Sequence, residues 1–359
     1  MINFILKRLF YGFLVLLGVI TVVFLLFNVL PGDPARMMLG QRADQTSIDA
    51  INKDLGRDKP LATQFLMYLN DLSPISIHDP LDKNNFLYLN PDKYSSYLKL
   101  FPVSHTKIVV LKYPYLRRSY ITKRKVADII RETLPETAVL AFAAISFGSF
   151  FGIILGIFSA LKKNSWFDKL SLVFAIFGMA LPSFFMGLII AWLFGFILRD
   201  YTGLNNVGSL FTTDDFGEEH LSLKNLILPT ITLGLRPLAI IIQLTRSSLL
   251  DVLSHDYIRT ATAKGLSFYK VIFKHALKNA LNPVITAISG WFAGLMAGAV
   301  FVEIVFNWKG IGYEVVDALN KNDLPVVMGT TLVFAVIFVI INIAVDIIYG
   351  ILDPRIRAQ

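Results

Sequence analysis

The stretch Asp256-Tyr-Ile-Arg-Thr-Ala-Thr-Ala-Lys-Gly-Leu266 lies between two long apolar segments and is too rich in charged and polar residues to enter a membrane. Residues 256–263 contain neither proline nor glycine and predict a short helix at the membrane surface. Gly265 follows where the C-terminus of a helix favours a residue that tolerates positive φ. The stretch therefore predicts a helix that ends in a glycine hinge.

A second helix is predicted directly after this hinge. Ser267 can cap its N-terminus, and lysines recur at every fourth position, 270, 274 and 278, beside apolar neighbours. Two interpretations are open on these residues alone. The pair of helices is either a basic connector that lies on anionic headgroups or a loop that contacts a partner protein.

The loop resembles a known motif. Arg259-Thr-Ala-Thr-Ala-Lys-Gly265-Leu, followed by His275-Ala-Leu-Lys-Asn-Ala-Leu-Asn-Pro283, is similar to the cytoplasmic "EAA" loop of ABC importer permeases, in the dipeptide and oligopeptide branch. Other stretches resemble landmarks of this family and occur in the family's order: Leu30-Pro-Gly-Asp-Pro34, Thr133-Leu-Pro135, Leu181-Pro-Ser183, Leu228-Pro229, Thr245-Arg-Ser-Ser-Leu249, Val302-Glu303, Gly310-Ile-Gly312 and Leu352-Asp-Pro-Arg-Ile356. The resemblance covers nearly the whole chain except about 31–130. It implies an all-α fold with six transmembrane helices, the type I ABC importer transmembrane fold.

In that family the loop forms a coupling helix that fits a groove of the ATPase subunit. The resemblance therefore implies a coupling role for nine residues: Asp256, Tyr257, Arg259, Thr260, Ala261, Thr262, Ala263, Lys264 and Gly265. The implied partners are a second homologous permease, two cytoplasmic ABC ATPases, an extracytoplasmic solute-binding protein and the lipid bilayer. The implied solute is a di- or oligopeptide, and nickel or another small solute such as a glycoside is the alternative. No cofactor is implied.

The sequence departs from the family pattern at a few positions. Arg259 and Thr260 stand where the broader family shows Glu and Ala, which is ordinary for the peptide branch. Thr262 stands where this branch usually shows a second Arg, so a partner contact at that position is in doubt. Lys309 replaces the Pro usual before Gly310.

The composition is that of a polytopic membrane protein. Of its 359 residues, 55% are hydrophobic and 17% charged, and cysteine is absent. The net charge of +8 does not indicate a nucleic-acid partner, because the cations of a membrane protein gather in its loops. Residues 112–125 interleave aromatic and basic side chains, which in a membrane protein indicates a loop near lipid headgroups rather than a nucleic-acid site.

Hydropathy divides the chain into four parts. Residues 1–30 hold a cytoplasmic N-terminus and a first transmembrane helix, and 31–130 form an extracytoplasmic region interrupted by prolines. Residues 131–352 hold five further spans around the cytoplasmic loop 251–278, with Pro182 as a kink in the third span of the chain. Residues 353–359 form a cytoplasmic tail. The cations of the short loops predict that both termini lie in the cytoplasm. The resemblance implies that the membrane is the inner membrane of a bacterial cell.

Two sets of residues inside the spans predict contacts. Glycines spaced by four residues give bare helix faces that suit close packing, one or both against the partner permease: Gly148, Gly152 and Gly156, and Gly290, Gly294 and Gly298. Ionisable residues within spans are costly unless they face protein or water. Arg236 is the preferred pathway residue, with pairing to a partner's carboxylate as the alternative. Glu303 either serves the pathway or reaches the outer interface. Asp346 is expected to form a structural anchor with Asn342, with a role in the pathway as the alternative.

Some chemistry is missing from the sequence. It contains no Gly-x-x-x-x-Gly-Lys-Ser/Thr, so no P-loop is predicted, and no His-Glu-x-x-His. We therefore predict no catalytic residue and no metal site, and a transport subunit rather than an enzyme. The rival interpretation is a stand-alone membrane enzyme or a secondary transporter. An enzyme would show an intramembrane nucleophile with a base or a set of metal ligands, and a secondary transporter often shows paired repeats with broken helices.

Overall fold

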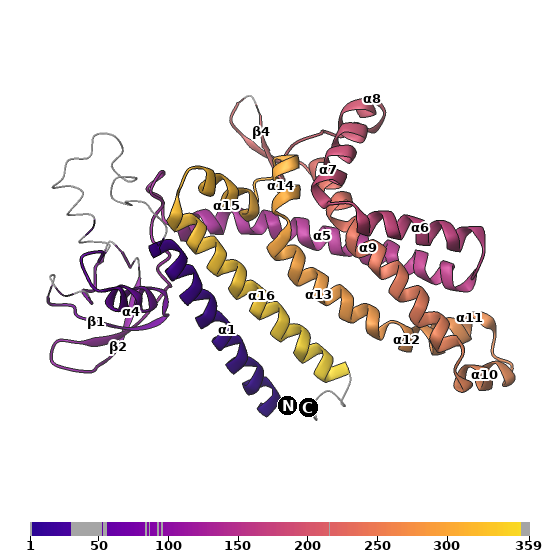
Figure 1. Ribbon diagram of the computed structural model, residues 1–359, viewed down its shortest axis with the longest axis horizontal. Coiled ribbons are helices and arrows are strands. Elements are labelled where there is room, and N and C mark those ends of the chain that lie inside the picture. Colours follow the sequence, from indigo (N-terminus) through magenta and orange to yellow (C-terminus); the bar gives the residue numbers. More distant parts are fainter. Residues whose placement is uncertain are drawn as a thin grey trace. The chain divides into compact units, whose positions relative to one another are not determined.

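The protein is described from a computed structural model, drawn as a ribbon in Figure 1. The structure describes residues 2–29, 52, 56–82, 85, 87–91, 93, 94, 96–214 and 216–352. The landmark predicted at 30–34, most of the landmark at 352–356 and the tail predicted at 353–359 lie outside these residues. The chain forms two compact units: Met1–Phe13 with Thr133–Glu314 and Phe334–Gln359, and Leu14–Glu132 with Val315–Val333.

The first unit is built mainly from helices (Figure 1). Helices α1 and α16 and the ends of α5 and α15 also contribute to the second unit. The elements are α1 (Ile2–Val29), α5 (Val126–Leu161), α6 (Trp166–Ala180), α7 (Ser183–Trp192), π-helical turn η2 (Leu193–Ile197), α8 (Arg199–Thr202), β4 (Phe211–Thr213), β5 (Glu219–Leu221), α9 (Lys224–Leu253), α10 (Asp256–Ala263), α11 (Phe268–Lys270), π-helical turn η3 (Val271–Ala276), α12 (Leu277–Ala280), α13 (Asn282–Gly298), α14 (Val300–Phe306), α15 (Ile311–Asn320) and α16 (Leu324–Leu352).

Within the described part of the chain, four helices are long and apolar enough to cross a membrane: Phe4–Leu26, Val126–Leu161, Lys224–Leu253 and Leu324–Ile347. Two bent pairs of helices also pass as possible spans, Trp166–Ala180 with Ser183–Ile197 and Asn282–Met296 with Val300–Phe306. The predicted number of six is reached when each bent pair counts as one span.

The third predicted span differs from the expectation. Instead of a kink at Pro182, the structure has two helices that meet at 110°. Leu181 is extended, with φ −84° and ψ 136°, because a residue before proline disfavours the helical conformation. Pro182 then precedes α7 as its N-cap residue. The segment is therefore a broken span or a re-entrant loop.

Helix α9 is the central element of the first unit. It contacts α6, α7, α12, α13 and α14, and 61% of its apolar window is buried. Helix α5 also approaches it closely, since a Cβ on Gly148 would lie 3.1 Å from the Leu238 backbone nitrogen and one on Gly152 would lie 2.8 Å from the Ile241 side chain. A helix enclosed in this way moves only together with its neighbours, so α9 ties the bundle to the loop that follows it.

The second unit contains structure that the sequence did not predict. Helix α4 (Leu61–Leu72) precedes strand β1 (Ile75–His78), which pairs with β3 (Ile108–Lys112), and β3 pairs with β2 (Tyr97–Pro102). The antiparallel sheet has the order β1-β3-β2. The region predicted only as an extramembrane stretch at 31–130 therefore holds a small folded subdomain.

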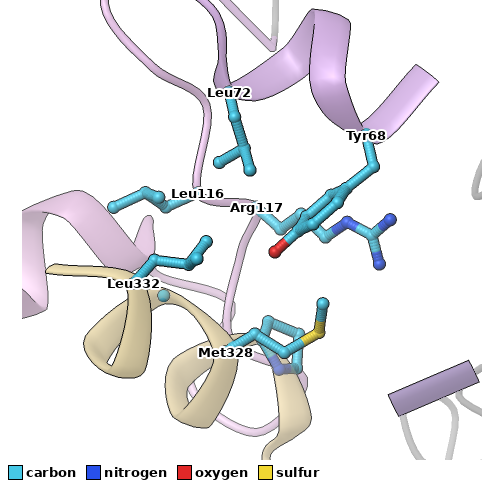
Figure 2. A pocket seen from close by; sticks show the side chains of 8 residues that line it. Tyr68, Leu72, Leu116, Arg117, Met328 and Leu332 are labelled. Carbon is cyan, nitrogen blue, oxygen red and sulfur yellow. The ribbon is translucent and has the colours of Figure 1, made fainter. Parts of the chain in front are cut away.

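Helix α4 packs on membrane helices of its own unit. The Phe24 ring of α1 lies 5.1 Å from that of Phe65 and 5.7 Å from that of Tyr68. Figure 2 shows Tyr68 and Leu72 of α4 opposite Met328 and Leu332 of α16, around a small pocket that Leu116 also lines. The subdomain is thus held to the ends of α1 and α16 by a shared apolar core.

Candidate coupling loop and intramembrane charges

The predicted surface helix is present as α10, Asp256–Ala263. Its last turn closes when the Gly265 N–H donates to the carbonyl of Thr262 at 3.0 Å. Gly265 has a φ of +75°, and no atom lies within 4 Å of the position that a Cβ would occupy there. A side chain at position 265 would therefore have room, and its cost would come from the backbone conformation alone.

The helix after the hinge is less regular than predicted. Ser267 occupies the N-cap position with φ −63° and ψ 148°, but its side chain makes no capping hydrogen bond, so the predicted cap is wrong. The segment continues as α11, the π-helical turn η3 and α12 instead of one α-helix. The π-turn buries Val271 and Ile272 toward α10 while Lys270 and Lys274 stay exposed.

Most of the predicted coupling residues are exposed. Ile258 and Ala261 are buried in a cluster with Ile272 and with Leu249 of α9. This burial corrects one prediction, because Ala261 faces the chain itself and is not available to a partner. The exposed residues are Asp256, Tyr257, Arg259, Thr260, Thr262, Ala263, Lys264 and Gly265.

Two polar contacts order the exposed face of α10. The Asn279 side-chain amide donates to the Tyr257 hydroxyl at 2.9 Å, which links α10 to α12. Arg259 pairs with Asp256 at 3.6 Å, but both side chains are highly exposed, so this ion pair adds little stability. The Arg259 guanidinium is therefore accessible to another molecule.

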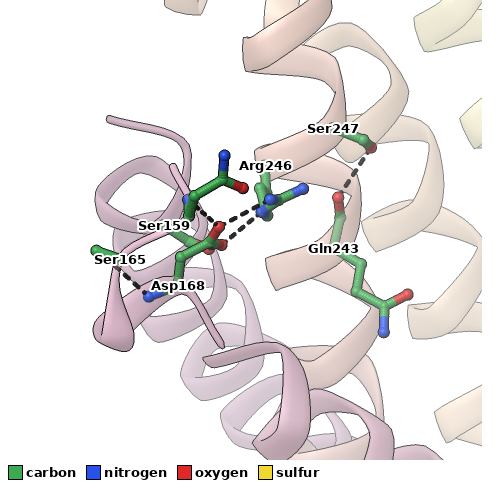
Figure 3. A network of polar contacts seen from close by, with 7 residues as sticks. Ser159, Ser165, Asp168, Gln243, Arg246 and Ser247 are labelled. Carbon is green, nitrogen blue, oxygen red and sulfur yellow. Dashed lines mark hydrogen bonds and ion pairs between the residues drawn. The ribbon is translucent and has the colours of Figure 1, made fainter. Parts of the chain in front are cut away.

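A buried ion pair lies just before this loop (Figure 3). The Arg246 guanidinium of α9 donates from Nε to Asp168 Oδ1 at 2.6 Å and from Nη2 to Oδ2 at 2.8 Å. The Ser159 hydroxyl and the Asn164 backbone N–H also donate to the Asp168 carboxylate, whose residue is 2% exposed. This cluster fixes the turn between α5 and α6 to α9, ten residues before α10 begins.

Sequence patterns point to only one half of this pair. Arg246 lies in Thr245-Arg-Ser-Ser-Leu249, which resembles a family landmark and has no predicted role. Asp168 stands 78 positions earlier in the chain. No local periodicity connects residues at that separation.

Glu303 does not reach an interface, because it is completely buried. Its carboxylate accepts a hydrogen bond from the Thr137 hydroxyl at 2.6 Å and another from the Tyr313 N–H at 2.8 Å. A Cβ on Gly312 would lie 2.9 Å from Glu303 Oε2, and a Cβ on Gly310 would lie closer still to the same carboxylate. The landmarks Val302-Glu303 and Gly310-Ile-Gly312 are therefore two sides of one packed site.

Asp346 pairs differently from the expectation. Its carboxylate lies 3.2 Å from Arg8 Nε of α1, and both side chains are partly exposed. The Asn342 amide donates to the Phe338 carbonyl of its own helix instead. Asp346 is thus an anchor between α1 and α16, and Asn342 is not its partner.

Arg236 remains without a partner among the described residues. It lies on α9 about 18 Å from the helix start, at 1.5 Å per residue. Its side chain is exposed, whereas Leu235, Pro237 and Leu238 beside it are buried. A guanidinium at this depth in an apolar helix requires water, a ligand or another chain.

The two glycine rows have different surroundings. Gly148, Gly152 and Gly156 face α9, where added Cβ atoms would lie within 3.0 Å of Gly234 O, 2.8 Å of Ile241 and 2.6 Å of Thr245. This row packs within the chain and does not need a partner permease. Gly290 and Gly294 have no heavy atom within 4 Å of a Cβ position, and the side-chain surroundings at Gly298 lie outside the description.

One group of possible metal ligands occurs among the described residues. Asp214, Glu218 and His220, at the β4–β5 hairpin, bring ligand atoms within 4.8 Å of one another. All three are exposed, and His220 Nε2 lies 2.9 Å from Asp214 Oδ2. The hydrogen bond with His220 is the main cause that lowers the pKa of Asp214. The contacts are those of a hairpin closed by a local ion pair.

The chain matches two models of known families. Residues 152–358 match "Binding-protein-dependent transport system inner membrane component", and residues 1–80 match the N-terminal part of the membrane component of such systems. The chain is 35% identical to the dipeptide transport system permease protein DppB of Alkalihalophilus pseudofirmus, over 99% of this chain and 100% of the relative. It is 33% identical to the glutathione transport system permease protein GsiC of Salmonella paratyphi A, over 99% of each chain.

These matches define an inner membrane subunit of a transport system. The chain belongs to the family of binding-protein-dependent transport system inner membrane components. The predicted fold class, a helical multi-pass protein with the type I ABC importer fold, is confirmed. Among solved structures, the inward-facing methionine ABC transporter MetNI is similar at 18% identity and a TM-score of 0.47, over 65% of this chain and 96% of that one.

Proposed function

We propose that this chain is one of two permease subunits of an ABC importer for peptides and forms half of the transmembrane pathway. Helix α10 and the turn after it carry this proposal, because Asp256–Gly265 presents eight exposed residues outside any candidate span and the turn is set by Gly265. Relatives named for dipeptide and glutathione transport support a peptide solute. Since the chain has no P-loop, two separate cytoplasmic ATPases supply the energy, and the chain itself is not an enzyme.

Coupling requires that a movement of α10 reach the spans. Ile258 and Ala261 pack on Leu249 of α9, so a displacement of α10 is transmitted to the central helix. The Asp168–Arg246 pair passes the same displacement to the turn between α5 and α6. We infer that closure of the ATPases moves α10, α9 and this turn as one body and switches the pathway from outward to inward access.

The second permease would cover two features of the first unit. The open row at Gly290 and Gly294 allows a helix of another chain to approach the backbone closely. Arg236 would then line the solute pathway between the two permeases, where water or the solute solvates its charge. A solute-binding protein outside the cell would deliver the peptide.

The proposed orientation has both termini, and loop 251–278, in the cytoplasm. The chain lacks cysteine, so single cysteines can be introduced and treated with a membrane-impermeant thiol reagent in sealed cells. A cysteine at position 262 should react only after the cells are opened. Labelling of that position from outside would overturn the orientation.

The solute is tested with the purified complex in proteoliposomes. A panel of labelled dipeptides, oligopeptides, nickel and sugars is offered together with the solute-binding protein and ATP. We expect ATP-dependent uptake of peptides and none of nickel. Uptake of nickel without uptake of any peptide would refute the peptide assignment while leaving the importer architecture in place.

A further inference from the structure

The β1-β3-β2 sheet has one face made only of apolar side chains. The register places Ile75 and Leu98 opposite Leu111, and it places Ile77 and Phe101 opposite Val109. Residues paired in this way project to the same side of a sheet. We call these six residues the apolar sheet face: Ile75, Ile77, Leu98, Phe101, Val109 and Leu111.

Most of the apolar sheet face is exposed in the described part of the chain. Leu98 is 66% exposed, Ile75 61% and Phe101 59%, and of the six residues only Val109 is buried. The opposite side of the sheet is where the subdomain has its core, since Val110 packs there with Leu89 and Tyr94. A contiguous apolar surface of this kind on the outside of a folded subdomain indicates a contact with a membrane or another molecule.

The subdomain packs on α1 near the end of the apolar span of that helix. Phe24, which contacts Phe65 and Tyr68 of α4, is close to the end of the apolar span Phe4–Leu26. Strand β1 begins three residues after α4 ends at Leu72. The last residues of a span lie at the boundary between hydrocarbon and headgroups, so the sheet is tethered close to that boundary.

The positive charge of the segment that holds β2 and β3 indicates what the apolar sheet face contacts. Residues 93–127, which include β2 and β3, contain nine Lys or Arg and no Asp or Glu. Lys99 and Lys112 project from the opposite face of the sheet, and the other seven lie in the segments that connect or flank the strands: Lys93, Lys107, Arg117, Arg118, Lys123, Arg124 and Lys125. Apolar side chains combined with cations are the signature of a surface that inserts among anionic headgroups. An apolar protein partner would need no such excess of positive charge.

We propose that the apolar sheet face rests in the headgroup region of the bilayer, with the surrounding cations on the phosphates of anionic phospholipids. The subdomain is then a peripheral membrane anchor beside the spans. This role is independent of the transported solute and of the coupling loop.

Neighbouring residues on β2 provide a matched test. Leu98→Cys places a thiol on the apolar sheet face, and Lys99→Cys places one on the opposite face, where Lys99 pairs with Val110. Each variant of the cysteine-free chain is assembled with its partner subunits, labelled with bimane and reconstituted in nanodiscs that contain phosphatidylglycerol and a lipid with a nitroxide near its headgroup. We expect the label at position 98 to lose most of its emission and the label at position 99 to keep it.

Two results would overturn the proposal. If the label at position 98 is quenched by aqueous iodide but not by the nitroxide lipid, the face is in water. If neither quencher reaches it, a protein subunit covers the face. Nanodiscs of phosphatidylcholine alone should weaken the lipid quenching, and unchanged quenching there would contradict the role assigned to the cations.

Discussion

Two arginines on α9, ten residues apart, have opposite surroundings. Arg246 makes a bidentate pair with Asp168, which is also held by Ser159 and Asn164. Arg236 is exposed and has no hydrogen-bond or ion-pair partner among the residues that the structure describes. Both are cations in an apolar helix, and among the described residues only Arg246 has a counter-charge.

The difference separates the residues of this chain into two groups. The first group has its contacts within the chain and holds the first unit together. Arg246 and Glu303 have polar partners there, and the glycine row at 148–156 packs on α9. Arg236 and the row at Gly290 and Gly294 face outward, as does most of α10. Changes in the first group should lower stability. Changes in the second group should leave the fold intact and should lower transport only where they disturb a contact with a partner subunit or the solute.

The largest effect is expected at the buried ion pair. Asp168→Asn leaves the Arg246 guanidinium partly buried without its counter-charge, so the free energy of unfolding should fall by about 3–5 kcal/mol. Thermal unfolding of the purified permease complex in detergent measures this loss. Arg246→Lys, which keeps the charge but loses the bidentate geometry, should cost less.

A double variant tests whether the stability loss in Asp168→Asn comes from the unpaired charge of Arg246. Asp168→Asn combined with Arg246→Gln removes both charges and should recover part of the stability lost in Asp168→Asn alone. A complex with Asp168→Asn that unfolds at the same temperature as the parent would contradict a structural role for the pair.

The two glycine rows should respond differently to the same substitution. Gly152→Leu inserts a side chain where the Ile241 side chain and the Leu238 carbonyl already lie within about 3 Å, so the permease itself should lose about 1–3 kcal/mol of stability or more. Gly294→Leu meets open space in this chain and should leave it folded while weakening co-purification with the second permease. Normal assembly and uptake in Gly294→Leu would place that face toward lipid.

Arg236 should be important for transport and not for folding. Arg236→Gln removes the charge without changing the buried residues around it, and we expect peptide uptake to fall by about tenfold, which equals 1.4 kcal/mol, at normal thermal stability. Arg236→Lys, which keeps a cation, should retain more uptake than Arg236→Gln. If Arg236→Gln instead lowers thermal stability as Asp168→Asn does, the arginine has a structural partner in the assembled complex.

The smallest effect is expected on the exposed side of α10. Thr262 is exposed, so Thr262→Arg should change stability by less than about 0.5 kcal/mol and should preserve uptake. Ala261→Arg is the matched control, because Ala261 is buried against the rest of the loop and an arginine there should displace α10. Equal uptake in the two variants would show that the burial of Ala261 does not position the helix.

Local patterns predicted the parts of this fold that depend on neighbouring residues. Helix 256–263 and the positive φ of Gly265 follow from residues within one short stretch. The apolar segments follow from runs long enough to cross a bilayer. These features were accessible because helix formation, glycine turns and hydropathy are properties of adjacent residues.

The rest depends on residues far apart in the chain. Thr137 and Glu303 are separated by 166 positions, and Asp168 and Arg246 by 78. Pro182 predicts a kink, whereas the structure has a break of 110° between two helices, and the size of this bend does not follow from the proline itself. The row at Gly148 to Gly156 showed that a close neighbour exists without showing that the neighbour is α9 of the same chain.

The coupling role of α10 is tested most directly by ATP hydrolysis in the reconstituted complex, with and without binding protein and peptide. Gly265→Val forces a β-branched residue to a φ of +75°, whereas Gly265→Asn places there a residue that tolerates this conformation. We predict that both variants insert and assemble normally, that Gly265→Val loses stimulation by peptide and binding protein, and that Gly265→Asn keeps it. Full stimulation in Gly265→Val at normal expression would mean that the angle of α10 does not matter to the ATPases and would contradict the proposed coupling.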